Sequence, residues 1–184
     1  MHIAATFERG GELLSPFSDE QVNQGFWYLF DSGNSPDFMA TLLNDEIPAA
    51  TRARALRSFV PLFEQVMAAR CTPNLSHLDE QPANPLNSAC YMWFDNLLDR
   101  FSPEKLMRSQ LGVEFLIVLS RVLAIPHDAC RESALHGIGH WIACYPQLAD
   151  IVNEFLSTTP DLRPQLIEYA NGARVGDLRV LTGG

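Results

Sequence analysis

The stretch from His127 to Tyr145, HDACRESALHGIGHWIACY, is the most informative part of the chain, because a helix formed by it has two opposed faces of different chemistry. A helical wheel turned at about 100° per residue brings four of its side chains into one row, namely Glu132, His136, His140 and Cys144. Apolar side chains gather on the opposite side of the wheel, namely Ala134, Leu135, Ile138, Trp141, Ile142 and Tyr145. An amphipathic helix buries its apolar side, so we expect the polar row to face outward or into a groove.

Helical periodicity continues on both sides of this stretch, from Ser18 to about Ala173, and no segment alternates apolar and polar residues as a strand would. The sequence therefore predicts an all-α protein that forms a single domain over residues 1–184. Residues 1–17 and 175–184 are expected to be irregular ends. Helices are expected at about 18–30, 36–44, 49–70, 85–101, 103–125, 126–145, 147–157 and 161–173.

Local signals refine three of these elements. Ser18 is followed three residues later by Gln21, the pattern of a capping box at a helix N-terminus. Pro61 lies inside the helix expected at 49–70 and predicts a kink, because proline has no amide hydrogen to donate. The segment 71–85, CTPNLSHLDEQPANP, has turn residues throughout and predicts a long loop, either a tolerated surface insertion or a functional loop.

Charge and cysteine usage limit the classes of partner. The chain has 22 acidic and 13 basic residues, a formal net charge of −9, which disfavours nucleic acid and favours a partner protein with a basic face. Its four cysteines show no CxxC pairing, which is typical of reduced thiols. The chain has no signal-peptide pattern, and no apolar run reaches the ~18 residues of a membrane span, so we expect a cytoplasmic protein without a membrane partner.

An internal repeat relates two of the expected helices. The segment NSACYMWFDNL (87–97) is similar to ESALHGIGHWI (132–142), and the Ser-Ala pair at Ser88 recurs at Ser133, 45 residues later. In period and pairing these segments resemble HEAT-like or armadillo-like α-solenoid repeats. The resemblance implies stacked antiparallel helix pairs in a short α-solenoid, with an irregular helical bundle as the alternative. The second helix of each pair often lines the concave side, which implies one groove that holds Tyr91, Asp95, His136 and His140.

The histidines of the polar row suggest a metal site. His136 and His140 are one helical turn apart, so both imidazoles can reach one zinc ion. Their pattern, HGIGH, has glycine where the HExxH motif of zinc proteases has its catalytic glutamate, which argues against a protease. The row spans about 18 Å of helix axis, so a third ligand is harder to supply, and the candidates are Glu132, Cys144, His77 and His127.

A cysteine nucleophile would need Cys130 or Cys144 beside a histidine that activates it. His140 is one turn from Cys144, but no Asn or Asp that would orient the histidine is identifiable from the sequence. The sequence therefore gives little support to this chemistry.

These observations favour a non-enzymatic interaction or adaptor module, with no cofactor, that binds a basic protein. Its expected acidic binding surface includes Tyr91, Asp95, Glu132, His136 and His140. The first alternative is a metal-binding protein or metal-dependent hydrolase, with zinc held by His136, His140 and Cys144. The second alternative is an inhibitor or immunity protein that neutralises a basic toxin.

Overall fold

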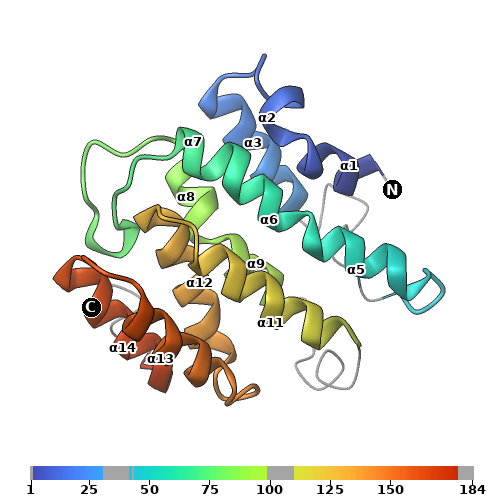
Figure 1. Ribbon diagram of the computed structural model, residues 1–184. Coiled ribbons are helices and arrows are strands. Elements are labelled where there is room, and N and C mark those ends of the chain that lie inside the picture. Colours follow the sequence, from blue (N-terminus) through green and yellow to red (C-terminus); the bar gives the residue numbers. More distant parts are fainter. Residues whose placement is uncertain (1, 31–41, 43, 99–109, 178–184) are drawn as a thin grey trace.

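The computed structural model describes most of the chain, namely residues 2–30, 42, 44–98 and 110–177. Every regular element within these ranges is a helix (Figure 1), which confirms the predicted all-α class. The helix expected at 36–44 falls almost wholly outside the described residues, and so do the last residues of the helix expected at 85–101 and the first of the one expected at 103–125. No described helix has the length and apolar character needed to cross a membrane.

The N-terminal region, expected to be irregular, begins with two short helices, α1 (His2–Glu8) and α2 (Gly10–Leu13). The prediction was wrong because Phe7 of α1 is buried and belongs to the aromatic core. Its ring lies edge-on against Phe26 and Trp93, with centroids 6.4 and 5.7 Å away. Burial of such a side chain contributes about 2 kcal/mol, which stabilises a helix too short to form by itself.

The next helix, α3 (Asp19–Phe30), begins where the sequence predicted. The Ser18 backbone N–H donates to Oε1 of Gln21 at 2.9 Å, and the Gln21 N–H donates to the Ser18 hydroxyl at 3.3 Å. Both hydrogen bonds of the capping box are therefore formed, and the prediction made from these two residues is confirmed.

The helix expected at 49–70 is present as four consecutive segments, namely α5 (Ala49–Arg57), α6 (Phe59–Leu62), the π-helical turn η1 (Phe63–Met67) and α7 (Ala68–Arg70). Pro61 explains the first break. An amide at position 61 would donate to the carbonyl of Arg57, four residues earlier, and proline has no such hydrogen. The α5 helix accordingly ends at Arg57, so the predicted interruption is present.

Residues 71–85 form the predicted long loop, which contains only the 3₁₀ turn η2 (Ser76–Leu78). The helices after the loop are α8 (Leu86–Tyr91), α9 (Trp93–Leu98), α11 (Gln110–Leu123), α12 (Asp128–Trp141), α13 (Leu148–Thr158) and α14 (Pro164–Val175). Val175 was expected in the irregular C-terminal end, but it is the last residue of α14. Gly176 follows with a φ of 68°, the left-handed conformation that glycine adopts without strain.

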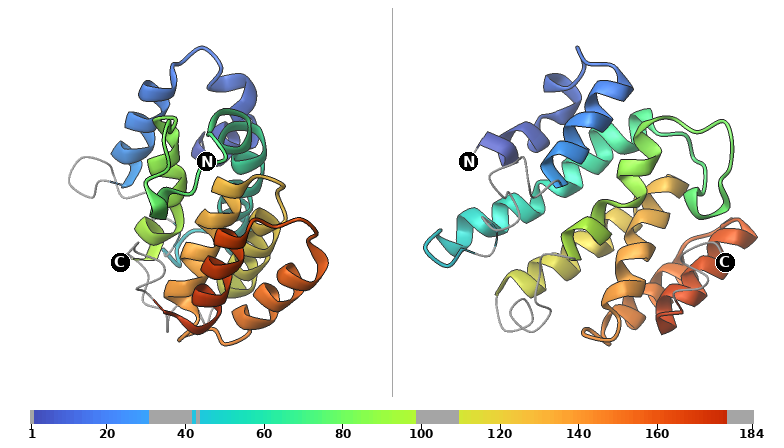
Figure 2. Two further views of the ribbon diagram at one scale, coloured as in Figure 1. Left: turned by 90° about the vertical axis from the view of Figure 1, so that its left-hand side faces the viewer. Right: turned by 180° about the vertical axis from the view of Figure 1, so that it is seen from behind.

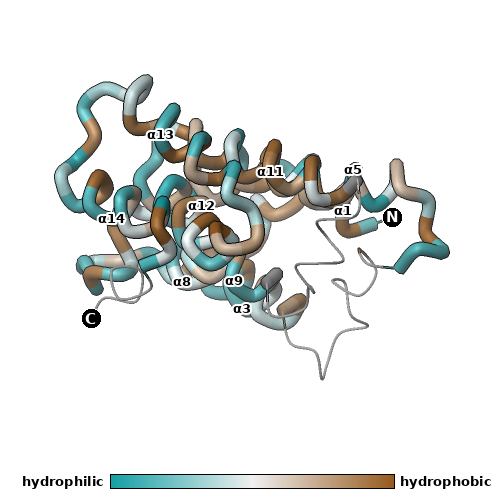
Figure 3. The backbone as a smooth tube through the Cα atoms, turned by 90° about the horizontal axis from the view of Figure 1, so that it is seen from below, coloured by the Kyte–Doolittle hydropathy of each residue, from teal (hydrophilic) through white to brown (hydrophobic). Residues whose placement is uncertain are grey.

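The α12 helix lies at the centre of the molecule (Figures 2 and 3). It packs against α8, α9, α11, α13 and α14. Because these helices cover it, its polar row does not face outward over the first half: Glu132 is 0% exposed and His136 is 3% exposed. The row was expected to face outward or into a groove; for these two side chains the outward alternative was wrong, since polar groups of other elements surround them instead of solvent. His140, one turn later, is half-buried.

The two helices that carry the repeated Ser-Ala pair, α8 and α12, lie against each other. The Ser133 hydroxyl donates to the Cys90 carbonyl oxygen at 2.5 Å, and both Ala89 and Ala134 are buried. The small side chains of the repeated Ser-Ala pair thus lie where the two helices are in close contact. A stack of HEAT-like helix pairs remains a prediction.

Candidate metal centre

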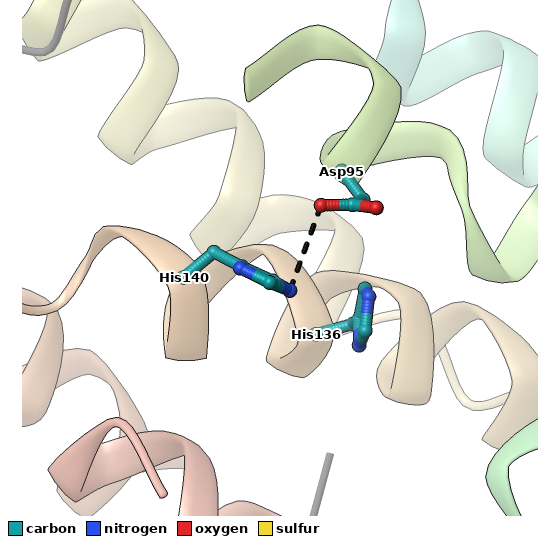
Figure 4. A group of neighbouring side chains, drawn as sticks. All are labelled: Asp95, His136 and His140. Atoms are coloured by element: carbon teal, nitrogen blue, oxygen red, sulfur yellow. Dashed lines mark ion pairs between the residues drawn. The ribbon is translucent and has the colours of Figure 1, made fainter. Parts of the chain in front are cut away.

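The structure brings a carboxylate to the two histidines of the polar row (Figure 4). One ligand atom from each of Asp95, His136 and His140 lies within 4.8 Å of the other two, and Nε2 of His140 is 3.5 Å from Oδ1 of Asp95. His136 is buried while the other two are half-buried, so the group lies between the interior and the surface. Two imidazoles and one carboxylate are common ligands of divalent transition metals.

Helix geometry and one glycine place these side chains. His136 and His140 are four residues apart on α12, so they project from the same side, and their ring centroids are 4.8 Å apart. Asp95 lies in the first turn of α9, which packs against α12. A Cβ atom at Gly137 would lie 2.6 Å from the Cβ of Phe94, the neighbour of Asp95. The missing side chain therefore lets α9 approach α12 closely enough for the carboxylate to reach the imidazoles.

Two tyrosines complete the surroundings of His136. Its Nδ1 atom lies 2.8 Å from the hydroxyl of Tyr169 on α14, and this hydroxyl donates to the Tyr91 hydroxyl at 3.3 Å. The Tyr91 ring also packs against the imidazole, with the centroids 4.3 Å apart. A ring contact and a hydrogen bond thus hold His136 in one orientation.

The charge state of these groups follows from their burial. Burial lowers the pKa of His136 to about 3, and the neighbouring His140 and His77 act in the same direction. The His136 ring is therefore neutral near pH 7 and keeps one nitrogen lone pair. Burial raises the pKa of Tyr91 to about 12 and also raises that of Tyr169, so both phenols keep their protons.

Glu132, the first member of the polar row, binds the long loop. Its carboxylate accepts the backbone N–H groups of Ser76 and His77 at 2.8 and 3.0 Å, and the Nδ1 atom of His77 lies 2.5 Å from Oε1. The His77 ring also stacks on Tyr169, with centroids 4.3 Å apart. The loop is therefore held against the central helix, and His77 has a structural role that the sequence did not predict.

Only some residues of the predicted binding surface are accessible in the structure. Tyr91, Asp95 and His140 are half-buried and lie near one another around the candidate metal centre. Glu132 and His136 were expected on the same surface, but they are buried under neighbouring helices and cannot contact a partner protein.

The structure also changes the predicted set of metal ligands. Cys144 lies beyond the end of α12, and its sulfur is not in the group of ligand atoms. His77 and His127 are not in the group either: the first binds Glu132, and Nε2 of the second lies 3.2 Å from a backbone carbonyl. Asp95 takes the third place. The solenoid resemblance had placed Asp95 in one groove with His136 and His140, although not as a metal ligand.

Comparisons with models of known protein families, with curated proteins and with solved structures gave no match. The function is therefore inferred from the geometry and chemistry of these residues.

Proposed function

We propose that this protein binds a divalent transition metal ion through Asp95, His136 and His140. The observation that carries this proposal is the convergence of one carboxylate and two imidazoles, with ligand atoms within 4.8 Å of one another. Ligand atoms about 2.0–2.2 Å from a tetrahedral zinc ion are roughly 3.5 Å apart. Small rotations of the half-buried Asp95 and His140 side chains therefore suffice to enclose an ion.

The hydrogen bonds of His136 support the same function. When the Tyr169 hydroxyl donates to Tyr91, its oxygen accepts the Nδ1–H of His136, and the lone pair of the imidazole is then on Nε2. A hydrogen bond from the second ring nitrogen is the usual support of a metal-bound histidine, because it fixes the tautomer and the orientation of the ring. Tyr169 thus presents Nε2 of His136 as a ligand.

Three protein ligands leave a coordination position for water, as in catalytic rather than structural zinc sites. A bound water would be acidified by the metal and become a nucleophile near neutral pH. Hydrolysis is therefore the activity to assay in the metal-loaded protein, in line with the metal-dependent hydrolase that the sequence allowed.

Elemental analysis of the untagged protein, after dialysis against zinc and removal of excess metal, tests the proposal. We expect about one zinc ion per chain in the wild type and clearly less than one in His140→Ala, which removes one of the three ligands. His2→Ala is the matched control, since this exposed histidine lies in α1 and not in the ligand group. Wild-type protein without metal, or equal binding by His140→Ala, would contradict the proposal.

A second candidate function is the interaction module favoured by the sequence. Two aromatic side chains near α3 support it, because Phe17 is 49% exposed and Trp27 is 37% exposed, and aromatic residues are enriched at protein interfaces. The net charge of −9 favours a basic partner. Replacing the exposed Glu20 by lysine should then weaken the binding of that partner. It should also make the binding less sensitive to salt. A partner bound equally well by Glu20→Lys would remove the electrostatic part of this candidate.

A further inference from the structure

The outer face of α11 carries apolar side chains that remain exposed to solvent. This helix lies at one face of the molecule, between α5 and α13, and packs on α12 (Figure 3). Val113 is 62% exposed, and Ile117, one turn later, is 45% exposed. Ser120 and Ala124, which follow on the same side of the helix, are exposed as well. Exposed apolar side chains that follow one another along a helix are typical of an interaction surface.

Arg121 on this face has no partner among the described residues. Every other arginine of the described ranges forms a hydrogen bond or an ion pair, namely Arg9, Arg52, Arg54, Arg57, Arg70, Arg131, Arg163 and Arg174. Glu114, two turns before Arg121, lies with its Oε2 atom 3.3 Å from Nε of Arg57, and its side chain is 22% exposed. The face therefore presents an unpaired cation and, seven residues away, a carboxylate that solvent still reaches.

These side chains are arranged almost symmetrically about Ile117. Turned at about 100° per residue, Glu114 and Arg121 lie on one flank of the outer face, and they are three residues before and four residues after Ile117. Val113 and Ser120 lie on the other flank, four residues before it and three after it. A second α11 helix that runs antiparallel, related by a two-fold axis at Ile117, therefore brings different side chains together on each flank.

The charges of the two copies complement each other in this arrangement. Arg121 of each copy lies opposite Glu114 of the other, and the contact forms twice because a two-fold interface is reciprocal. The guanidinium thus gains the carboxylate that it lacks in the single chain. Complementary charges of this kind fix the register of an interface.

The shapes of the two copies match in the same register. Ser120 and Ala124 border a hollow of about 140 Å³ between α11 and α13. Its apolar walls include Leu123, Ile151 and Phe155. The antiparallel arrangement directs Val113 of the second copy to the space between Ser120 and Ala124, and the two Ile117 side chains meet at the axis. The bulky half of the face therefore lies on the half with small side chains.

We propose that this protein forms a symmetric dimer through the outer face of α11, with the second copy antiparallel and the two-fold axis at Ile117. The surface takes no part in the proposed metal centre, and the dimer does not depend on bound metal. One helix pair makes a smaller contact than the roughly 1,200–2,000 Å² of a standard interface. The dimer therefore dissociates on dilution.

Sedimentation equilibrium of the full chain, in a chelator so that no metal ion can bridge two copies, tests the proposal. Over loading concentrations of about 5–500 μM, which cover weak association, we expect the mean mass to rise from that of one chain towards that of two. Ile117→Lys should remain monomeric, because it places two ammonium groups at the axis. The matched control is Ile167→Lys on α14, where the isoleucine is 39% exposed, and it should associate like the wild type.

Two charge variants test the register. Arg121→Glu places a carboxylate opposite Glu114 of the second copy, and Glu114→Arg places a guanidinium opposite Arg121. Each variant alone should associate about tenfold more weakly than the wild type, or less, because like charges then face each other on both contacts. An equimolar mixture of the two variants has unlike charges at both contacts and should form dimers again.

Three results would each overturn the proposal. The first is a wild type that stays monomeric at the highest concentration, and the second is association of Ile117→Lys at the wild-type level. The third is a mixture of the two charge variants that associates no more tightly than the separate variants. If Glu114→Arg does not fold, because it loses its contact with Arg57, Ile117→Lys and Arg121→Glu decide the proposal.

Discussion

His77 and Glu132, 55 residues apart in the chain, form a buried pair in which Nδ1 lies 2.5 Å from Oε1 and the two side chains are 6% and 0% exposed. A carboxylate in the interior is costly unless its oxygens accept hydrogen bonds. Glu132 accepts two backbone N–H groups of the long loop besides the imidazole. The pair therefore fixes the position of the loop on α12, and it also holds His77 against the Tyr169 ring.

Replacing Glu132 by alanine should lower the free energy of unfolding by about 3–5 kcal/mol, because the loop donors and the imidazole then remain buried without an acceptor. Urea unfolding followed by circular dichroism measures this loss. Glu154→Ala on α13 is the control, since Glu154 is exposed, and a change within about 0.5 kcal/mol is expected there. Equal stability of Glu132→Ala and the wild type would show that the loop is held by other contacts.

The fold class and most helix positions were predictable because they depend on local signals. The Ser18 and Gln21 pair predicts a helix start that needs no distant residue, and Pro61 predicts a break through its own missing hydrogen. The N-terminal helices were not predictable in this way. Their formation depends on Phe7 meeting Phe26 and Trp93, and such contacts between distant segments leave no periodic pattern in a short stretch.

The candidate site was predictable only in part. The spacing of His136 and His140 on one helix is a local property, and it correctly places their rings together. The burial of Glu132 is not local, because a wheel cannot show that other parts of the chain cover this side of α12. The hydrogen bond between Nδ1 of His136 and the Tyr169 hydroxyl likewise joins residues 33 positions apart, and no pattern in the sequence relates them.

Replacing Gly137 by alanine should destabilise the protein by about 1–3 kcal/mol, because the new Cβ would lie 2.6 Å from the Cβ of Phe94 and push α9 from α12. Metal affinity should fall as well, since α9 carries Asp95. Gly25→Ala on α3 is the matched control.

Apart from the neighbouring residues and backbone of α3 itself, no atom of the described residues lies within 4 Å of a Cβ at Gly25, so this second alanine should stabilise its helix by about 0.5–1 kcal/mol. Thermal unfolding should then show a lower Tm for Gly137→Ala and a higher Tm for Gly25→Ala than for the wild type. Shifts of the same sign would contradict close packing at Gly137 as the cause.

Replacing Tyr169 by phenylalanine should weaken zinc binding by about tenfold or more, because it removes the hydroxyl that holds Nδ1 of His136 and keeps the ring that His77 contacts. Isothermal titration with zinc measures the change. The control is Tyr145→Phe, whose hydroxyl is buried without a hydrogen-bond partner among the described residues. The control should keep full zinc affinity, and an equal loss in both variants would mean that Tyr169 acts through general stability alone.

The Glu80 and Arg163 pair predicts how stability depends on pH. Nη1 of Arg163 lies 3.1 Å from Oε2 of Glu80, and the Leu75 N–H donates to the same oxygen at 2.9 Å. The hydrogen bond from Arg163 is the main cause that lowers the pKa of Glu80 below its ordinary value of 4.5, with the Leu75 N–H and the charge of Arg163 acting in the same direction. Because the folded pKa is the lower one, the unfolded chain binds the proton first as the pH falls.

The stability from this pair is therefore fully present above about pH 4.5 and is lost as the pH falls through the lowered pKa of the folded state. Glu80→Gln keeps the size of the side chain and has no proton to bind. It should be less stable than the wild type near pH 7, and the difference in unfolding free energy between the two should shrink as the pH falls below about 4.5. Denaturant unfolding at several pH values measures this difference. Glu80 lies in the long loop, and Arg163 directly precedes α14. A difference that does not change with pH would mean that the charge of Glu80 adds nothing to the attachment of the loop to this end of α14.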